Sequence, residues 1–252
     1  RSAVAASMAL PAIFTPVVRS RDQLLMDGGL VNPLPFDLLT GTADGTLLTL
    51  ARRGDEWEVC ADGFTLMSSR SHGSEDELAR LAFAKAPHAR TVLVGGLGLG
   101  FSLRATLDLL GPRGKVVVAE QSPSVVEWNR VHVGDLAARP LEDPRVSVRV
   151  GDVRERIREA RAAYDLILLD VDNGPAALIH DSNASLYDAT GVVACHVALK
   201  KTGALAVWAT GPDDGYLRRL QRSGFDASAV RVAPRPGAGG RKHVIFVAVK
   251  AP

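Results

Sequence analysis

The sequence predicts an α/β fold: a doubly wound, mostly parallel seven-stranded sheet with a small antiparallel strand unit and an N-terminal appendage ahead of it. Two observations carry this prediction. From Thr91 onward, short apolar runs alternate with helical stretches, and the chain of 252 residues is 46% hydrophobic and 23% charged, enough to bury a core. Because parallel strands need crossover helices, the alternation indicates a sheet covered on both faces.

The sheet elements follow in order along the chain. The strands are expected at Val92 to Gly95, Lys115 to Glu120, Val146 to Val150, Leu166 to Asp170, Ala204 to Thr210, Ala227 to Val232 and His243 to Val249. Helices are expected up to Leu110, from Ser122, from Val153, near Ala184 to Leu199, and from Asp213. A Pro/Gly-rich turn between the last two strands predicts a hairpin that makes one edge strand antiparallel.

Three units are expected: an appendage at 1–45, a small β-strand unit at 46–72 and a nucleotide-binding domain at 73–252. The small unit reads as an antiparallel meander, with strands at Thr46 to Ala51, Glu56 to Cys60 and Phe64 to Ser68. A helix is expected to open at Ser74 and run to about Ala86. Its Ser-x-x-Glu pattern, Ser74 to Glu77, predicts a capping box.

The composition excludes several classes of binding partner. Thirty basic and 28 acidic side chains leave a net charge of +2, too balanced for a protein that neutralises many nucleic-acid phosphates. Cys60 and Cys195 offer neither a disulfide framework nor metal-ligand spacing, and the six histidines are scattered. No uninterrupted apolar run is long enough to span a membrane. We therefore expect a cytoplasmic protein with a small-molecule partner, no metal, no nucleic acid and no membrane.

A glycine-rich turn follows the first strand of the sheet. Gly95, Gly96, Gly98 and Gly100 would let the backbone approach a nucleotide, with the next helix supplying free N–H groups. Glu120 lies 22 residues after Gly98 at the tip of the second strand, where a carboxylate can accept the ribose hydroxyls, with Gln121 beside it. The alternatives are a tight packing turn and a charge ahead of the next helix.

Three further acids end strands of the sheet. Asp152, followed by Val153, could address an adenine edge or cap the next helix, and the residues leave this open. Asp170 and Asp172 close the fourth strand at the edge where doubly wound sheets hold ligands, so one of them is expected to face the reacting group. An Asp-rich turn ahead of a Gly-Pro pair is the alternative.

Residues 46–250 resemble the spermidine synthase group of aminopropyltransferases, which share the fold of class I S-adenosylmethionine-dependent methyltransferases. The resemblance lies in Val-Leu-Val-x-Gly-x-Gly-x-Gly at 92–100, Val-x-Glu at 118–120, Gly-Asp at 151–152 and Tyr-Asp-Leu-Ile-Leu-Leu-Asp at 164–170. It implies decarboxylated or intact S-adenosylmethionine over Gly96, Gly98 and Gly100, with Glu120 on the ribose, Asp152 near adenine and Asp170 holding and deprotonating an amine or polyamine. It also implies a homodimer.

The chain departs from this family at the substrate end. Leu99 stands where the family has an acid that holds the aminopropyl ammonium, Glu75-Asp76-Glu77 replaces its Tyr-His-Glu, and Asn173 replaces the second acid of its loop, for which Asp172 could substitute. The acidic trio could attract a polyamine, although a solvated helix start is the favoured interpretation. A methyltransferase and a catalytically silent binding module remain open.

Residues 2–39 are similar to the closing part of patatin-like phospholipases. The resemblance is carried by the Asp-Gly-Gly that begins at Asp27, whose acid partners a nucleophilic serine in that family. No Gly-x-Ser-x-Gly occurs in the 252 residues, so lipid acyl hydrolysis is not predicted for this chain alone.

Overall fold

The computed structural model describes residues 17–20, 23–25, 36–43, 46–171, 174–175, 184–235 and 242–251, with side chains from residue 47 onward. The predictions for Asp27 and Asp172 lie outside these residues.

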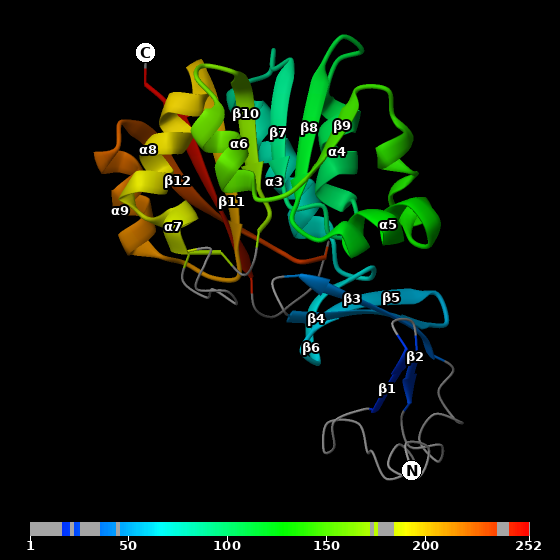
Figure 1. The fold of residues 1–252 in the computed structure, drawn as a ribbon. Helices are drawn as coiled ribbons and strands as arrows, with labels where there is room; N and C mark the ends of the chain where they lie inside the picture. The colour runs from blue at the N-terminus through cyan, green and yellow to red at the C-terminus, as the bar shows by residue number, and fades with distance from the viewer. Residues whose placement is uncertain are drawn as a thin grey trace.

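A seven-stranded sheet forms the centre of the molecule, as the sequence predicted (Figure 1). Its strand order is β12-β13-β11-β10-β7-β8-β9, and every neighbouring pair except those of β13 is parallel. The strands are β7 (Thr91–Gly95), β8 (Lys115–Glu120), β9 (Val146–Val150), β10 (Tyr164–Leu169), β11 (Leu199–Ala209), β12 (Phe225–Val232) and β13 (His243–Lys250).

The expectation of an antiparallel edge strand was wrong. The antiparallel strand is β13, and it lies between β11 and β12, with Ala204 opposite Val249 and Val232 opposite His243. Burial explains the order: β13 carries an unbroken run of buried apolar residues, whereas exposed positions interrupt β12. A strand that is apolar on both faces is stable only inside the sheet, so the alternating strand takes the edge.

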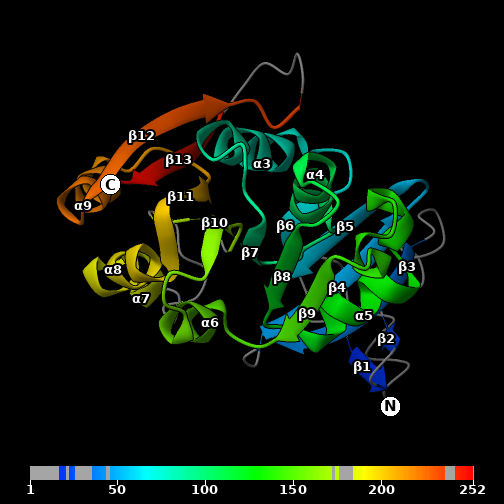
Figure 2. The ribbon, with the colours of Figure 1, turned by 90° about the horizontal axis from the view of Figure 1, so that it is seen from above.

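Helices cover both faces of the sheet and make two cores (Figure 2). On one face lie α3 (Gly73–Lys85), α4 (Phe101–Leu109) and α5 (Pro123–Val131). On the other lie α6 (Val153–Glu159), α7 (Ala184–Tyr187), α8 (Ala189–Ala198) and α9 (Asp214–Arg222). Two short 3-10 turns, η1 (Gly134–Ala137) and η2 (Pro140–Glu142), connect α5 to β9. The fold is therefore a three-layer sandwich.

Side chains at four helix starts accept backbone hydrogen bonds: Ser122 at α5, Asp152 at α6, Asp188 at α8 and Asp213 at α9. The capping box predicted for Ser74 and Glu77 was wrong. Helix α3 begins after His72, and Ser74 lies inside its first turn, fully buried. The Ser74 hydroxyl bonds Glu75 and His243 instead of the helix backbone, while Glu77 pairs with Arg80.

A second, antiparallel sheet lies below the carboxyl ends of the parallel strands (Figure 1). Its strands are β3 (Phe36–Ala43), β4 (Thr46–Arg53), β5 (Glu56–Ala61) and β6 (Phe64–Ser68). The predicted meander is β4 to β6, and β3 adds a strand that pairs with β4 along its full length. The division expected at residue 45 stays a prediction, and it would cut between these paired strands. A separate hairpin joins β1 (Val17–Ser20) and β2 (Gln23–Leu25).

The small sheet shares a core with the main one. Leu48, Leu50 and Val59 belong to the same buried cluster as the residues of β7, α3 and α4. Its strands are therefore fixed against the edge of the parallel sheet where the sequence predicts ligand binding.

Candidate functional site

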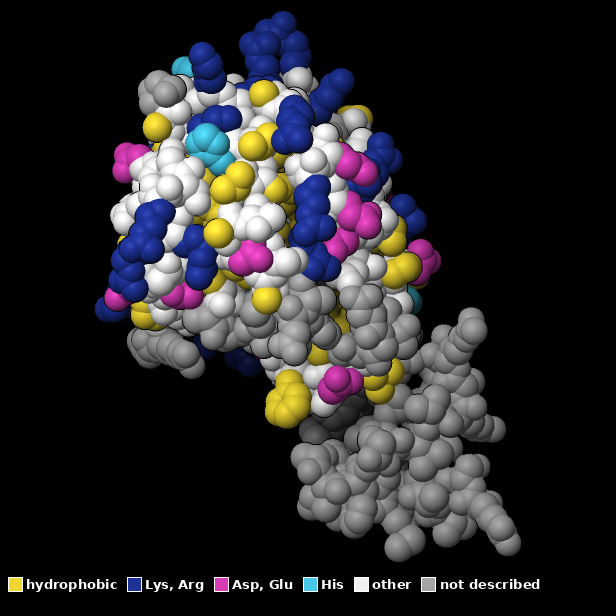
Figure 3. All heavy atoms as spheres, turned by 60° about the vertical axis from the view of Figure 1, so that its left-hand side comes forward, with side chains coloured by type: hydrophobic (Ala, Val, Ile, Leu, Met, Phe, Trp, Pro, Cys, Tyr) yellow, Lys and Arg dark blue, Asp and Glu magenta, His cyan; other side chains and the backbone are white. Residues whose placement is uncertain are grey.

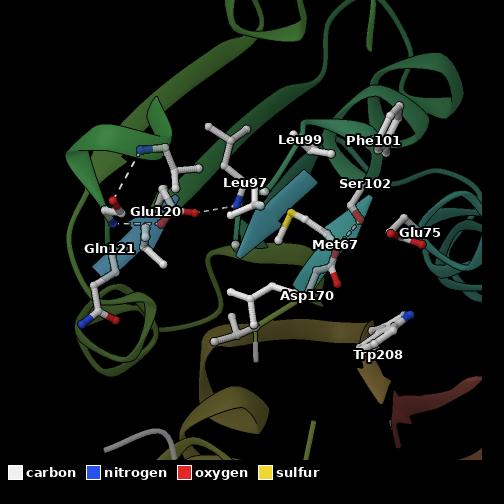
Figure 4. A pocket seen from close by; sticks show the side chains of 18 of the residues that line it. Met67, Glu75, Leu97, Leu99, Phe101, Ser102, Glu120, Gln121, Asp170 and Trp208 are labelled. Atoms are coloured by element: carbon white, nitrogen blue, oxygen red, sulfur yellow. Dashed lines mark hydrogen bonds between the residues drawn. The ribbon is translucent and has the colours of Figure 1, made fainter. Parts of the chain in front are cut away.

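A cavity of about 480 Å³ opens between the carboxyl ends of the parallel strands and β6 of the small sheet (Figure 4). Its size is in the range of about 300–1,000 Å³ that is typical of small-molecule sites. Seven residues predicted from the sequence line it: Gly96, Gly98, Glu120, Gln121, Asp152, Val153 and Asp170. Met67, Glu75, Ser102, Trp208 and His243 line it too. The fold thus brings the glycine-rich turn and the strand-end acids to one place.

The glycine-rich turn needs glycine for two reasons. Gly96 has φ +87°, and a Cβ there would lie 2.1 Å from the backbone oxygen of Asp170. Gly98 has φ +52°, and a Cβ there would lie 2.9 Å from the sulfur of Met67. The turn is therefore pressed against the end of β10 on one side and against β6 on the other.

Two of the predicted glycines do not line the cavity. Gly95 ends β7, where a Cβ would meet Val153, and Gly100, at φ +89°, immediately precedes α4. They shape the turn without lining the cavity, and their direct contact with a nucleotide stays a prediction.

Glu120 is fixed at the tip of β8 by backbone donors from two turns (Figure 4). The N–H of Leu97 donates to Oε2 at 2.9 Å, and the N–H of Ser122 donates to Oε1 at 2.8 Å. Burial raises the pKa of Glu120, although these N–H groups lower it. Backbone N–H groups of Gly98 and Gln121 act on the carboxylate as well, so donors from both turns hold it at the wall of the cavity.

Both sequence interpretations of Glu120 are thus represented. The bond from Ser122 ties the carboxylate to the start of α5, and the same side chain lines the cavity. Its contact with a ribose stays a prediction.

Asp152 caps α6. Its Oδ1 accepts from the N–H of Arg154 at 2.8 Å, and its Oδ2 accepts from Nε of Arg154 at 2.6 Å. Burial raises the pKa of Asp152, but the Arg154 bonds and charge outweigh it and leave the pKa below its ordinary value. The capping alternative is confirmed, and the contact with adenine stays a prediction.

Asp170 follows β10 directly and lies in the cavity opposite the glycine-rich turn. The hydroxyl of Ser102, in the first turn of α4, donates to Asp170 Oδ2 at 2.5 Å. Burial raises the pKa of Asp170, and the Ser102 bond lowers it in part. A carboxylate with an elevated pKa, beside a cavity, is a candidate general base.

The acidic trio divides in two. Asp76 is exposed and pairs with His72, and Glu77 pairs with Arg80, as a solvated helix start requires. For Glu75 that interpretation was wrong, because its carboxyl lines the cavity. Burial, followed by the charge of Asp170, raises the pKa of Glu75 to about 8. The cavity therefore places a second acid of raised pKa beside Asp170.

Most of the residues that line the cavity were not predicted as site residues, among them four from separate elements. Met67 comes from β6, Ser102 from α4, Trp208 from β11 and His243 from β13. The ring of Trp208 packs edge-on against His243, with centroids 4.7 Å apart. Ser102 could have been found, since it lies two residues after the turn at a helix start. No sequence signal pointed to the other three.

The basic stretch that begins at Arg154 forms a solvated helix face along α6. Arg154 pairs with Asp152 and Arg156 with Glu159. On the face seen in Figure 3, Lys and Arg side chains are interspersed with acidic, polar and hydrophobic ones. Within the described ranges, no helix is long and apolar enough to cross a membrane.

Comparisons with known proteins bear out both resemblances. A family model described as patatin-like phospholipase matches residues 1–40. Curated proteins named polyamine aminopropyltransferase match parts of the chain. The one from Korarchaeum cryptofilum is 34% identical over 80 residues, or 32% of this chain and 24% of that protein. The one from Mycobacterium tuberculosis is 28% identical over 168 residues, or 66% and 31%.

Solved structures agree on the fold. A spermidine synthase from Thermotoga maritima has a TM-score of 0.68 at 20% identity, covering 85% of this chain and 72% of that one. A spermidine synthase in complex with the transition-state analogue AdoDATO has a TM-score of 0.73 at 20% identity, covering 86% and 75%. This chain spans about a quarter to a third of the length of the first two curated relatives, at 24% and 31%.

Proposed function

We propose that the chain is a spermidine synthase-like transferase. In this proposal it binds decarboxylated S-adenosylmethionine and transfers the aminopropyl group to a small amine acceptor. The observation that carries the proposal is the placement of Glu120 and Asp170 on either side of the Gly96–Gly98 turn in one cavity. The names of the curated relatives support it.

The residues present suit a nucleoside. Gly96 and Gly98 expose backbone rather than side chains to the cavity, and Glu120 presents a carboxylate at the cavity wall, the acceptor type that suits ribose hydroxyls. The apolar side chains of Leu97 and Val153 line the same end, beside Gln121 and Asp152, where an adenine ring would lie.

The chemistry needs one base. An amine at neutral pH is an ammonium ion, which has no lone pair to attack with until a proton leaves. Asp170 is the group that would hold this ammonium and accept the proton, and Ser102 fixes its Oδ2. The freed lone pair then forms a C–N bond as the C–S bond breaks, with the electron pair retained by sulfur. Holding the amine in line with this carbon accounts for much of the acceleration.

A second candidate is a methyltransferase that uses intact S-adenosylmethionine. Leu99 favours it, because this side chain is only 3% exposed, is apolar, and occupies the position where the resemblance expects an acid for the aminopropyl ammonium. Preference for the donor lacking the carboxylate separates the two candidates.

The experiment is calorimetric titration with decarboxylated S-adenosylmethionine, S-adenosylmethionine and methylthioadenosine, followed by turnover assays with amines. We expect binding of the decarboxylated donor and product formation. In Asp170→Asn, turnover is expected to disappear while nucleotide binding persists. Failure of all three nucleotides to bind refutes both candidates, and full turnover in Asp170→Asn removes Asp170 from the mechanism.

Two further parts of the proposal concern assembly and location in the cell. A homodimer and a cytoplasmic setting are included in it, the latter supported by the free thiols of Cys60 and Cys195. A patatin-type hydrolase is not proposed, because the printed sequence lacks the Gly-x-Ser-x-Gly that would accompany Asp27.

A further inference from the structure

A chain of hydrogen bonds at the wall of the cavity links α3 to β13 through a buried serine. The hydroxyl of Ser74 donates to Oε2 of Glu75 at 2.6 Å. Nδ1 of His243 lies 2.9 Å from the same hydroxyl oxygen. The three residues thus connect the first turn of α3 with the first residue of β13, two segments that are far apart in sequence.

The direction of these bonds follows from the donors available. When Glu75 is ionised, the single hydrogen of the Ser74 hydroxyl is directed to its carboxylate, so the Ser74 oxygen then accepts from His243 Nδ1–H. Ser74 is fully buried, so solvent does not replace either bond. The ring of His243 is held in place by its edge-on contact with Trp208.

We propose that Ser74 and His243 are positioning residues that fix the Glu75 carboxyl toward Asp170 at the acceptor end of the cavity. This inference rests on the proposed function, because it assigns Glu75 a role in holding the acceptor cation. Figure 4 shows Glu75, Ser102 and Asp170 around the same part of the cavity, with Trp208 below them.

The groups around Glu75 explain how the Ser74 and His243 hydrogen bonds would affect its ionisation. Asp170, at the end of β10, and Asp76, on the same helix, act on it with like charge. The neighbouring elements α4 and β11 contribute the uncharged Ser102 and Trp208 to this cavity, and β13 contributes His243. The Ser74 bond therefore favours ionised Glu75 against the neighbouring acids, and an ammonium placed between the two carboxyls would complete the ionisation.

The test is a pH titration of the Glu75 carboxyl by ¹³C NMR on the full chain without any ligand, with Glu75→Gln identifying its signal. In the wild type we expect a midpoint well above that of an exposed glutamate. Ser74→Ala and His243→Phe are expected to raise it by about one pH unit, because each removes a hydrogen bond that supports the charged form.

Two matched variants separate hydrogen bonding from packing. His243→Phe keeps a ring against Trp208 but loses Nδ1, whereas His243→Asn loses the ring and keeps an amide donor close to the Nδ1 position. The asparagine variant is therefore expected to restore the wild-type midpoint. Asp76→Asn isolates the effect of charge on the same helix turn: it removes a like charge near Glu75 and leaves the Ser74 bonds in place, so it is expected to lower the midpoint.

Unchanged midpoints in Ser74→Ala and His243→Phe overturn the inference. So does a His243→Asn variant that behaves like His243→Phe. If Ser74→Ala fails to fold, the two His243 variants still decide. The midpoints are measured without substrate, so they test the inference even if the wild type shows no turnover. Absence of turnover counts against the proposed function alone. If turnover is found, the KM for putrescine should rise by up to about tenfold in His243→Phe at neutral pH, with kcat little changed.

Discussion

Replacing Glu120 by glutamine is the perturbation that addresses nucleotide binding most selectively. Glutamine has the size of glutamate, so the tip of β8 keeps its shape. It removes the charge and turns one of the two acceptor oxygens into a donor NH₂ group. In the structure the two oxygens accept from Leu97 and Ser122, at 2.9 and 2.8 Å, so only one of these bonds survives.

The expected loss follows from the hydrogen bonds at stake. A hydrogen bond to a charged group contributes about 1.5–3 kcal/mol, so losing one ribose hydroxyl bond weakens nucleoside binding about 10- to 150-fold. Folding stability should change less. Burial raises the pKa of Glu120, which means that the ionised carboxylate costs stability in the fold, and glutamine removes that cost while losing one backbone partner.

The assay is calorimetric titration of methylthioadenosine into the wild type and the variant, with thermal unfolding measured in parallel. Glu127→Gln is the control, because this exposed residue of α5 does not line the cavity. We expect weakened binding in Glu120→Gln alone and melting temperatures within a few degrees of each other. Equal affinity of Glu120→Gln and wild type would refute the placement of the ribose at this carboxylate.

Three further predictions concern the same framework. Gly96→Ala should lower the melting temperature by about 4–8 °C, because its Cβ would lie 2.1 Å from the Asp170 oxygen at φ +87°; an unchanged melting curve contradicts this. Asp165→Asn should cost about 2 kcal/mol in urea unfolding at pH 7, since Asp165 binds Lys200 and three donors of residues 90 and 91. These bonds outweigh the effect of burial and lower the pKa of Asp165. Its contribution to folding stability is therefore present above the ordinary pKa of 3.8 and is lost as the pH falls through its lower folded-state pKa. A stability difference between variant and wild type that persists in acid argues against this role. Ser102→Ala should move the acidic limb of the kcat/KM profile to higher pH, because its bond lowers the pKa of Asp170; an unshifted limb rules this out.

The layered fold could be predicted because its signals are local. Alternating apolar strands, a glycine-rich turn and helix-start residues such as Ser122 each act within a few positions. The order of the last two strands could not be read from the turn between them. It depends on which strand can be buried on both faces, and the unbroken apolar run of β13 was the available signal.

The nucleotide end of the site could be predicted for the same reason. Gly98 and Glu120 belong to a turn and a strand tip whose spacing fixes their neighbourhood. The role of Asp152 was left open, since a carboxylate after a strand can cap a helix or bind a ligand. The structure shows the cap, with Arg154 holding both oxygens.

The acceptor end could not be predicted, because its residues meet only in the tertiary structure. Ser74 followed the pattern of a helix cap, but β13 places His243 against it and draws it into the core. Glu75 looked like one member of a solvated acidic run, and the approach of Asp170 and the small sheet turns its position into a cavity wall.

The central claim is that an adenosyl donor lies over the Gly96–Gly98 turn with its sugar at Glu120. A crystal structure of the chain with methylthioadenosine tests it most directly. We predict the 2′ and 3′ hydroxyls within hydrogen-bond distance of the Glu120 carboxylate and the sulfur toward Asp170. A nucleoside bound elsewhere would contradict the claim. So would a ribose turned away from Glu120 while the Glu120 carboxylate keeps its bonds to Leu97 and Ser122.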